Sequence, residues 1–368
     1  MRAVKLLIMT SLLVGLPPIG IALAGKPLAR YLEFPPLTHY VEHASFSWTA
    51  FVLLTTLVLA IFAPLTVRIV SAPHTPRVHD RGARRFPWWG WFGVGVMALA
   101  WVFAWTRFSW FRPLQPFTFT PLWVGYILIM NALTFQRSGG CLMLDRAQYF
   151  WTLFPLSAAF WWFFEYLNRF VQNWYYIGGT DFGPLEYFLR ATLPFSTVLP
   201  AVLSTSEWLT TYPRMSQALR NAWPLRMTHP RVVSWSVLFL AGAGLMGIGI
   251  WPDYLFPLLW ISPLLIITSL QAIVGEETIF SGIRQGDWRA IGIPALAGLV
   301  CGFFWEMWNS RSFAHWEYAV PFVDRWHLFE MPLLGYAGYL PFGLECLVIA
   351  NFLSGARYGR AFGGPQGG

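Results

Sequence analysis

The sequence predicts an all-α fold, a polytopic transmembrane helical bundle of about ten spans that includes two parallel four-helix repeats. Three observations support this fold class. Hydrophobic residues make up 56% of the 368-residue chain, charged residues make up only 11%, and long apolar stretches recur along it. A soluble domain usually has about 25% charged residues, whereas about 20 apolar residues span a bilayer. Because lipid offers the backbone no hydrogen-bond partners, each of these stretches must form a helix.

The predicted spans follow one another from the first residues of the chain almost to its end. They are 4–24, 49–70, 88–107, 121–136, 149–168, 187–208, 232–250, 254–274, 290–309 and 331–352. The first of them also resembles a signal peptide, because "MRAVKLLIMTSLLVGLPPIGIALAG" (1–25) has a basic start, an apolar core and an A-x-A sequence. We favour a retained helix over a cleaved one, since the later helices need no separate export signal.

The basic residues lie mainly on alternate connections between the predicted spans. One side of the membrane receives most of the 25 Lys and Arg residues: Arg2, Lys5, Arg68, Arg77, Arg81, Arg84, Arg85, Arg137, Arg146, Arg214, Arg220, Arg226, Arg231, Arg284, Arg289, Arg357 and Arg360. The positive-inside rule places these connections in the cytoplasm. We therefore predict a bacterial inner (plasma) membrane protein with both termini cytoplasmic. Topology explains the net charge of +8, so we expect no nucleic-acid partner.

The predicted repeats carry the same short motif near their outer ends. "FFEYLNRFVQNWYY" (163–176) and "FFWEMWNSRSFAHWEY" (303–318) each have two Phe residues, a Glu, an Asn three residues after it, and an aromatic cluster. An even number of helices gives both units one orientation, as in parallel repeats. The predicted segments are a two-helix leader with a basic cytoplasmic loop (1–87), the first repeat (88–208), a basic cytoplasmic linker (209–231), the second repeat (232–352) and a disordered cytoplasmic tail (353–368).

The motif supplies the candidate site. Glu and Asn three residues apart lie on one face of a helix, and this holds for Glu165 with Asn168 and for Glu306 with Asn309. The next helix of each repeat begins at a similar depth, near Glu186 in the first and near Glu330 in the second. We expect these groups to meet at a shared interface near the periplasmic side. The candidate catalytic residues are Glu165, Asn168, Glu186, Glu306, Asn309 and Glu330, and the candidate substrate-binding residues are Trp174, Trp316, His315, His327 and Glu345.

Ionisable side chains at membrane depth indicate function by default. A carboxyl group in an apolar setting retains its proton readily, while an ionised partner stabilises positive charge. This pairing suits protonation of an alkene, with Trp faces adding cation–π stabilisation. The same carboxylates with His315 or His327 are also suitable ligands for a divalent metal. The three cysteines show no CxxC spacing, and we predict neither a metal nor a cofactor.

A purely structural interpretation competes with the functional one. Glu165 and Arg169, and likewise Glu186 and Arg190, are four residues apart and suited to ion pairs. Glu186 and Glu330 also lie where a helix N-terminus favours a carboxylate. For Glu345 the structural alternative is a protonated carboxyl group that bonds to a neighbouring helix.

The order of an acidic residue, "NWYY" (173–176) and "GPLEYFLRATLPF" (183–195) resembles the lycopene cyclase domain of carotenoid-forming membrane proteins. The resemblance implies acid-initiated ring closure of a polyene without redox change. The family's second Glu is replaced here by Tyr187 and Met331. The resemblance carries over to Glu165, Trp174, Pro184 and Glu186, and more loosely to Glu306, Trp316 and Glu330.

Three functions remain open from the sequence. The first is an intramembrane enzyme acting on an isoprenoid, carotenoid or other lipid, which predicts a closed, lipid-sized cavity enclosing the carboxylates. The second is a transporter or proton-coupled carrier, which predicts a polar path past Glu345 to Glu207. The third is a non-catalytic subunit of a membrane complex, which predicts that each Glu is engaged by an Arg. The sequence leaves protein partners undetermined.

Overall fold

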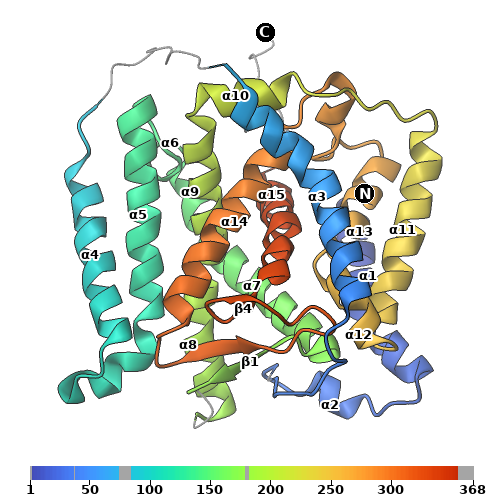
Figure 1. The fold of residues 1–368 in the computed structure, drawn as a ribbon, viewed down its shortest axis with the longest axis horizontal. Helices are drawn as coiled ribbons and strands as arrows, with labels where there is room; N and C mark the ends of the chain where they lie inside the picture. Colours follow the sequence, from blue (N-terminus) through green and yellow to red (C-terminus); the bar gives the residue numbers. More distant parts are fainter. Residues whose placement is uncertain (1, 37, 74–83, 179–181, 355–368) are drawn as a thin grey trace.

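The computed structural model describes residues 2–36, 38–73, 84–178 and 182–354 and shows a bundle of helices (Figure 1). The predicted tail lies almost entirely outside these residues, as does most of the predicted basic loop near residue 80. The long helices are α1 (Arg2–Leu23), α3 (Trp48–Ser71), α4 (Trp88–Trp105), α5 (Phe119–Ser138), α7 (Ala147–Val171), α8 (Pro184–Phe195), α9 (Val198–Thr210), α11 (Pro230–Gly247), α13 (Ser262–Ile273), α14 (Arg289–Asn309) and α15 (Tyr339–Ser354).

Shorter elements connect these helices. They are α2 (Ala29–Leu32), η1 (Ser109–Phe117), α6 (Leu142–Asp145), α10 (Pro213–Arg220), α12 (Pro252–Leu255), η2 (Phe256–Leu259), η3 (Ser281–Gln285) and η4 (Leu333–Gly338). Two short antiparallel pairs, which the sequence did not predict, join β1 (Trp174–Ile177) to β2 (His315–Tyr318) and β3 (His327–Leu328) to β4 (Met331–Pro332).

The helices are compatible with a multi-pass membrane protein by their length and composition. Among the described residues, six helices are long and apolar enough to cross a membrane, and two bent helix pairs raise the number to eight. The predicted span 187–208 is divided between α8 and α9. The predicted span 254–274 is likewise bent by 53° between 259 and 262. Pro194 and Pro263 lie at these breaks, where a missing N–H and a fixed backbone angle interrupt a helix.

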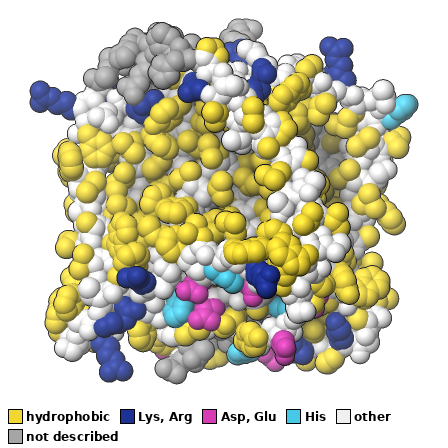
Figure 2. Space-filling view, in the orientation of Figure 1, with side chains coloured by type: hydrophobic (Ala, Val, Ile, Leu, Met, Phe, Trp, Pro, Cys, Tyr) yellow, Lys and Arg dark blue, Asp and Glu magenta, His cyan; other side chains and the backbone are white. Residues whose placement is uncertain are grey.

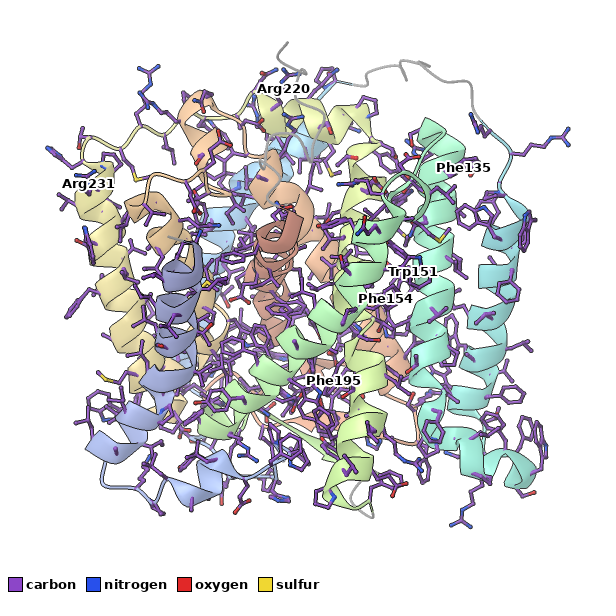
Figure 3. The ribbon with its side chains drawn as sticks, turned by 180° about the vertical axis from the view of Figure 1, so that it is seen from behind. Phe135, Trp151, Phe154, Phe195, Arg220 and Arg231 are labelled. Atoms are coloured by element: carbon purple, nitrogen blue, oxygen red, sulfur yellow. The ribbon has the colours of Figure 1, made fainter. Side chains whose placement is uncertain are left out.

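The surface has the distribution of side chains that a bilayer requires. Figure 2 shows hydrophobic side chains over the middle of one face and Lys and Arg along its upper and lower margins. Seen from behind, α7 crosses the bundle obliquely, and Arg220 and Arg231 mark the end opposite to β1 (Figures 1 and 3). This face of the bundle therefore has an apolar middle between two charged margins.

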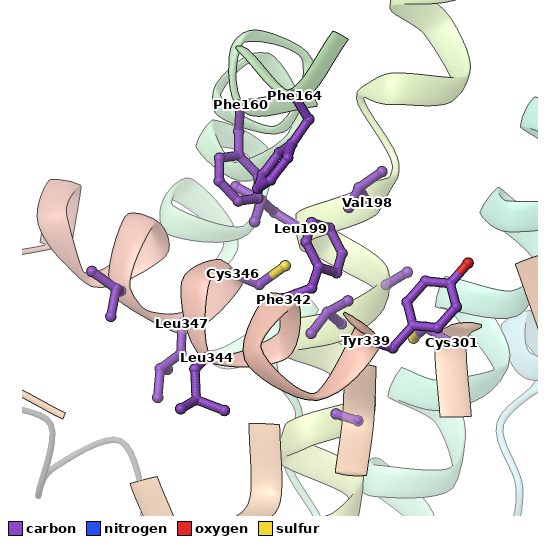
Figure 4. Close-up of a cluster of buried hydrophobic side chains, with 14 of the residues drawn as sticks. Phe160, Phe164, Val198, Leu199, Cys301, Tyr339, Phe342, Leu344, Cys346 and Leu347 are labelled. Atoms are coloured by element: carbon purple, nitrogen blue, oxygen red, sulfur yellow. The ribbon is translucent and has the colours of Figure 1, made fainter. Parts of the chain in front are cut away.

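The centre of the bundle is formed by α7, α9, α14 and α15. Figure 4 shows Phe160 and Phe164 of α7 meeting Phe342 of α15, and the ring centroids of Phe160 and Phe342 are 5.8 Å apart. The helices α14 and α15 cross at Gly298 and Gly343, where a Cβ on either residue would clash with the backbone of the other helix. Small residues of this kind let membrane helices approach closely. The crossing brings the C-terminal half of α14 against the start of α15.

Candidate functional site

A large apolar cavity lies beside the β1–β2 pair. Its volume is about 770 Å³, which is within the range of about 300–1,000 Å³ typical of small-molecule sites. Side chains from α7, α8, α14, β1, β2 and α15 line it, and α3 covers one side with Leu54, Leu57, Val58, Ile61 and Phe62. Other side chains of α3, such as Leu53 and Leu59, are exposed on the surface of the bundle. On that side, α3 therefore faces both the cavity and the surface of the bundle.

Glu165 lies directly behind the cavity wall and is completely buried in α7. Its Oε1 accepts three hydrogen bonds: from Trp161 Nε1 at 2.9 Å, from Trp174 Nε1 at 3.1 Å and from the Tyr176 hydroxyl at 2.5 Å. All three donors line the cavity. The Oε2 atom is buried without a hydrogen-bond partner among the described residues. One layer of aromatic side chains thus stands between this carboxyl group and the cavity.

Glu306 has the corresponding position in α14. It is completely buried, and its Oε1 accepts hydrogen bonds from the hydroxyls of Tyr318 at 2.7 Å and Tyr339 at 2.5 Å. Trp316 Nε1 donates to the Tyr318 oxygen at 2.8 Å. These three aromatic residues also line the cavity, and the Glu306 Oε2 likewise has no partner in the described part of the chain. Both glutamates therefore reach one cavity through phenol groups.

The β1–β2 pair positions these aromatic donors. Its register places Trp174 opposite Tyr318 and Tyr176 opposite Trp316. Because side chains alternate along a strand, these four residues lie on one face of the pair, which is the cavity face. Tyr175 and Glu317 lie on the opposite face, where the Tyr175 hydroxyl donates to Glu317 at 2.6 Å.

Asn168 and Asn309 hold the two strands against their helices. The Asn168 Nδ2 donates to the Trp174 carbonyl at 2.7 Å, and its Oδ1 accepts from the Asn173 N–H at 2.8 Å. The Asn309 amide binds both backbone groups of Trp316, at 2.7 and 2.8 Å. Both asparagines are completely buried. They position the strands that carry the donors rather than contacting the glutamates.

The phenols of β1 and β2 keep their protons. Burial, together with the adjacent carboxyl groups of Glu165 and Glu306, raises the pKa of Tyr176 and Tyr318 well above the ordinary value. Each hydroxyl is therefore a stable donor toward its carboxyl group. A neutral phenol that bonds to a carboxyl group can also pass a proton to or from a ligand in the cavity.

The other predicted carboxylates lie apart from this arrangement. Glu186 is half-exposed and forms an ion pair with Arg190 at 2.5 Å, as the structural interpretation predicted. Glu330 is half-buried in the turn between β3 and β4. Of the four predicted carboxylates, Glu165 and Glu306 are the two that accept hydrogen bonds from indole and phenol groups lining the cavity.

Two further acidic residues bind the ends of neighbouring helices. Glu345 is buried, and its Oε1 accepts from the Leu264 N–H at 3.1 Å in the first turn of α13. Glu207 accepts from the Leu142 N–H at 2.6 Å and lies 3.4 Å from Arg146. Each of these carboxyl groups thus accepts a hydrogen bond from a backbone N–H at the start of another helix.

The predicted histidines differ in their surroundings. His315 lines the cavity and lies 3.6 Å from Glu317. His327 is exposed and lies 2.8 Å from Asp324. Within the described ranges, no group of three or more His, Cys, Asp or Glu residues is arranged to hold a metal ion.

The predicted pair between Glu165 and Arg169 is not among the ion pairs of the described residues. Arg169 instead donates to the Pro35 carbonyl at 2.8 Å. Glu165 is therefore held by indole and phenol groups rather than by a guanidinium.

Sequence reasoning identified the donor Trp174 but missed the other donors to the two carboxyl groups, namely Trp161, Tyr176, Tyr318 and Tyr339. A signal for three of them was present, since a Trp-x-Tyr sequence recurs at 174–176 and 316–318 and Trp161 precedes Glu165 by one helical turn. No local pattern marks Tyr339, because it lies 33 residues from Glu306. No protein-family model, curated protein or solved structure matches this chain.

Proposed function

We propose that this multi-pass membrane protein is an intramembrane enzyme that binds an isoprenoid or similar lipid and acts on it by acid–base chemistry. One observation carries the proposal: the aromatic groups that bond to Glu165 and Glu306 line a single apolar cavity of about 770 Å³. An apolar ligand would lie in contact with two phenol–carboxyl pairs and little else that is polar.

The two pairs support complementary proton transfers. At one pair, a ligand C–H gives its proton to the tyrosine oxygen while the tyrosine proton passes to the carboxylate. At the other pair, a protonated carboxyl group passes its proton through tyrosine to an alkene carbon of the ligand. Loss and gain of one proton move a double bond or close a ring without any change of oxidation state. This is the reaction class that the resemblance to lycopene cyclase domains implies, and here it remains our proposal.

The proposal includes the two parallel repeats, 88–208 and 232–352. It also includes about ten spans, because α7 and the α8–α9 pair are added to the eight candidate spans among the described residues. Equivalent positions of the two repeats have the same role: Glu165 and Glu306 each accept a hydrogen bond from a tyrosine of the strand that follows their helix. In the β1–β2 register Tyr175 lies opposite Glu317, its counterpart in the second repeat. A two-fold relation between the repeats would produce this register.

The proposal also places both termini in the cytoplasm of a bacterial inner membrane. Cys141, Cys301 and Cys346 are buried, so single introduced cysteines report orientation. On intact cells with a permeable outer membrane, we expect a membrane-impermeant maleimide to label Ser109→Cys. We expect Thr228→Cys to be labelled only after the inner membrane is opened. Both positions are exposed, and the reverse pattern would show the opposite orientation.

Extraction of lipids from the purified protein tests the function itself. We expect mass spectrometry to find one isoprenoid or related lipid bound to the wild-type protein. Ala191→Trp would fill the cavity, because Ala191 lines it from α8, and this variant should lose the lipid. Leu193→Trp is the control, since Leu193 is exposed on the same helix. If no lipid co-purifies and cell lipids stay unchanged after deletion of the gene, the enzyme proposal is wrong.

A further inference from the structure

The charges around the cavity have predominantly one sign. Among the described lining residues, Arg190 is the one Lys or Arg, and it is paired with Glu186 at 2.5 Å. Its guanidinium also lies over the rings of Phe117 at 4.5 Å and Phe182 at 4.2 Å. In contrast, two carboxyl groups lie immediately behind the aromatic wall. An anionic head group inside the cavity would therefore meet two acidic groups and no uncommitted guanidinium.

The polar atoms near the two carboxyl groups are mainly hydrogen-bond acceptors. The indole N–H groups of Trp161 and Trp174 and the hydroxyls of the three tyrosines donate to the carboxyl oxygens. Their hydrogen atoms are thus engaged away from a ligand. The Asn173 Oδ1, in another lining residue, is buried without a partner among the described residues. So are the second oxygens of both glutamates.

The wall between these acceptors consists largely of electron-rich rings. Trp260 and Trp305 join Trp161, Trp174, Trp316 and Tyr339 in lining the cavity. Faces of Trp and Tyr attract ammonium groups, and the attraction is strongest where water is excluded. The carboxyl groups of Glu165 and Glu306 lie behind this wall and, when ionised, add an electrostatic attraction for a positive charge in the cavity. Both features favour a ligand that carries positive charge within an apolar body.

We propose that the cavity selects a hydrophobic amine, whose protonated nitrogen lies against the aromatic wall in front of Glu165 and Glu306, over the carboxylic acid with the same hydrocarbon chain. This inference rests on the proposed function in that both use the same cavity as a lipid site. The inference specifies in addition that the ligand carries a positive charge. A bound ammonium also occupies the position in which a protonated alkene would carry positive charge, so the amine acts as a competitive mimic of the reacting lipid.

A matched series of ligands tests the inference on the purified full-length protein in neutral detergent. The probes are a C18 amine, alcohol and carboxylic acid, each with bromine on the chain, which quenches indole fluorescence on contact. At pH 7 we expect the amine to bind at least about tenfold more tightly than the acid, with the alcohol between them. In the Glu165→Gln/Glu306→Gln double variant, the amine should lose about tenfold in affinity and the alcohol should change little.

Glu277→Gln is the matched control, since Glu277 is exposed and is not a lining residue, and it should leave the order of affinities unchanged. Equal binding of acid and amine by the wild-type protein would overturn the charge inference and leave the cavity as a lipid site. If none of the three ligands quenches the fluorescence, the cavity is not a lipid site and the proposed function fails as well. The wild-type series decides the question even if the double variant does not fold.

Discussion

Glu306→Gln is expected to lower turnover of the cavity's lipid by about 10²–10⁴-fold, the usual contribution of a positioned acid or base, while the protein remains folded. An amide has nearly the shape of the carboxyl group, and its oxygen can still accept from Tyr318 and Tyr339, which lie 2.7 and 2.5 Å from Oε1. It cannot take up or release the proton that the reaction requires. Glu165→Gln should have an effect of the same order, because Glu165 has the same kind of partners.

The measurement is the amount of product in lipid extracts of a deletion strain that expresses each variant, with thermal unfolding of the purified protein alongside. Glu317→Gln is the matched control. Glu317 lies on the outer face of β2 and accepts from Tyr175, so its replacement should leave product formation close to wild type. Normal product from Glu306→Gln, with normal unfolding temperature, would remove Glu306 from the reaction.

The second large effect is expected on the fold. A Cβ at Gly343 would lie 1.9 Å from the Pro294 carbonyl oxygen, which belongs to the backbone of α14 and has little freedom to move. Gly343→Ala should therefore force α14 and α15 apart and destabilise the protein by about 3 kcal/mol, the upper part of the range for overpacking. The same separation would pull Tyr339 of α15 away from Glu306 of α14, so lipid binding should fall together with stability.

Gly95→Ala is the control for this substitution. Gly95 lies in α4, and a Cβ there meets nothing within 4 Å. Alanine also favours a helix over glycine by about 1 kcal/mol, so this variant should be as stable as the wild type or slightly more stable. Thermal unfolding followed by size-exclusion chromatography compares the two variants. Equal stability would show that the α14–α15 crossing tolerates a larger separation than the structure indicates.

The sequence was informative wherever a property belongs to a single segment. Hydropathy within about 20 residues predicted a helical membrane protein. The spacing of three between Glu165 and Asn168 predicted a common helix face, and the recurrence of the motif drew attention to Glu306 and Asn309. Both glutamates proved to be completely buried. Composition and local periodicity suffice for such features because they depend on neighbours along the chain.

The sequence was less informative about the partners of these residues. It suggested Arg169 for Glu165, but the structure gives that carboxyl group two indoles and a phenol. It offered two environments for Glu186, a shared acidic site and an ion pair with Arg190, and the structure shows the ion pair in a half-exposed position. The local sequence did not decide the environment in either case, since burial depends on which helices pack together.

The sequence by itself therefore determined the membrane class and the two acidic positions. Only the tertiary structure decided that β1 pairs with β2, that Tyr339 reaches Glu306 across the α14–α15 crossing, and that the donors enclose a cavity. The physical reason is the range of the interactions. Hydropathy and helical periodicity act within one segment, whereas a hydrogen bond between residues 33 positions apart forms only when close packing of separate helices brings both groups to the same place.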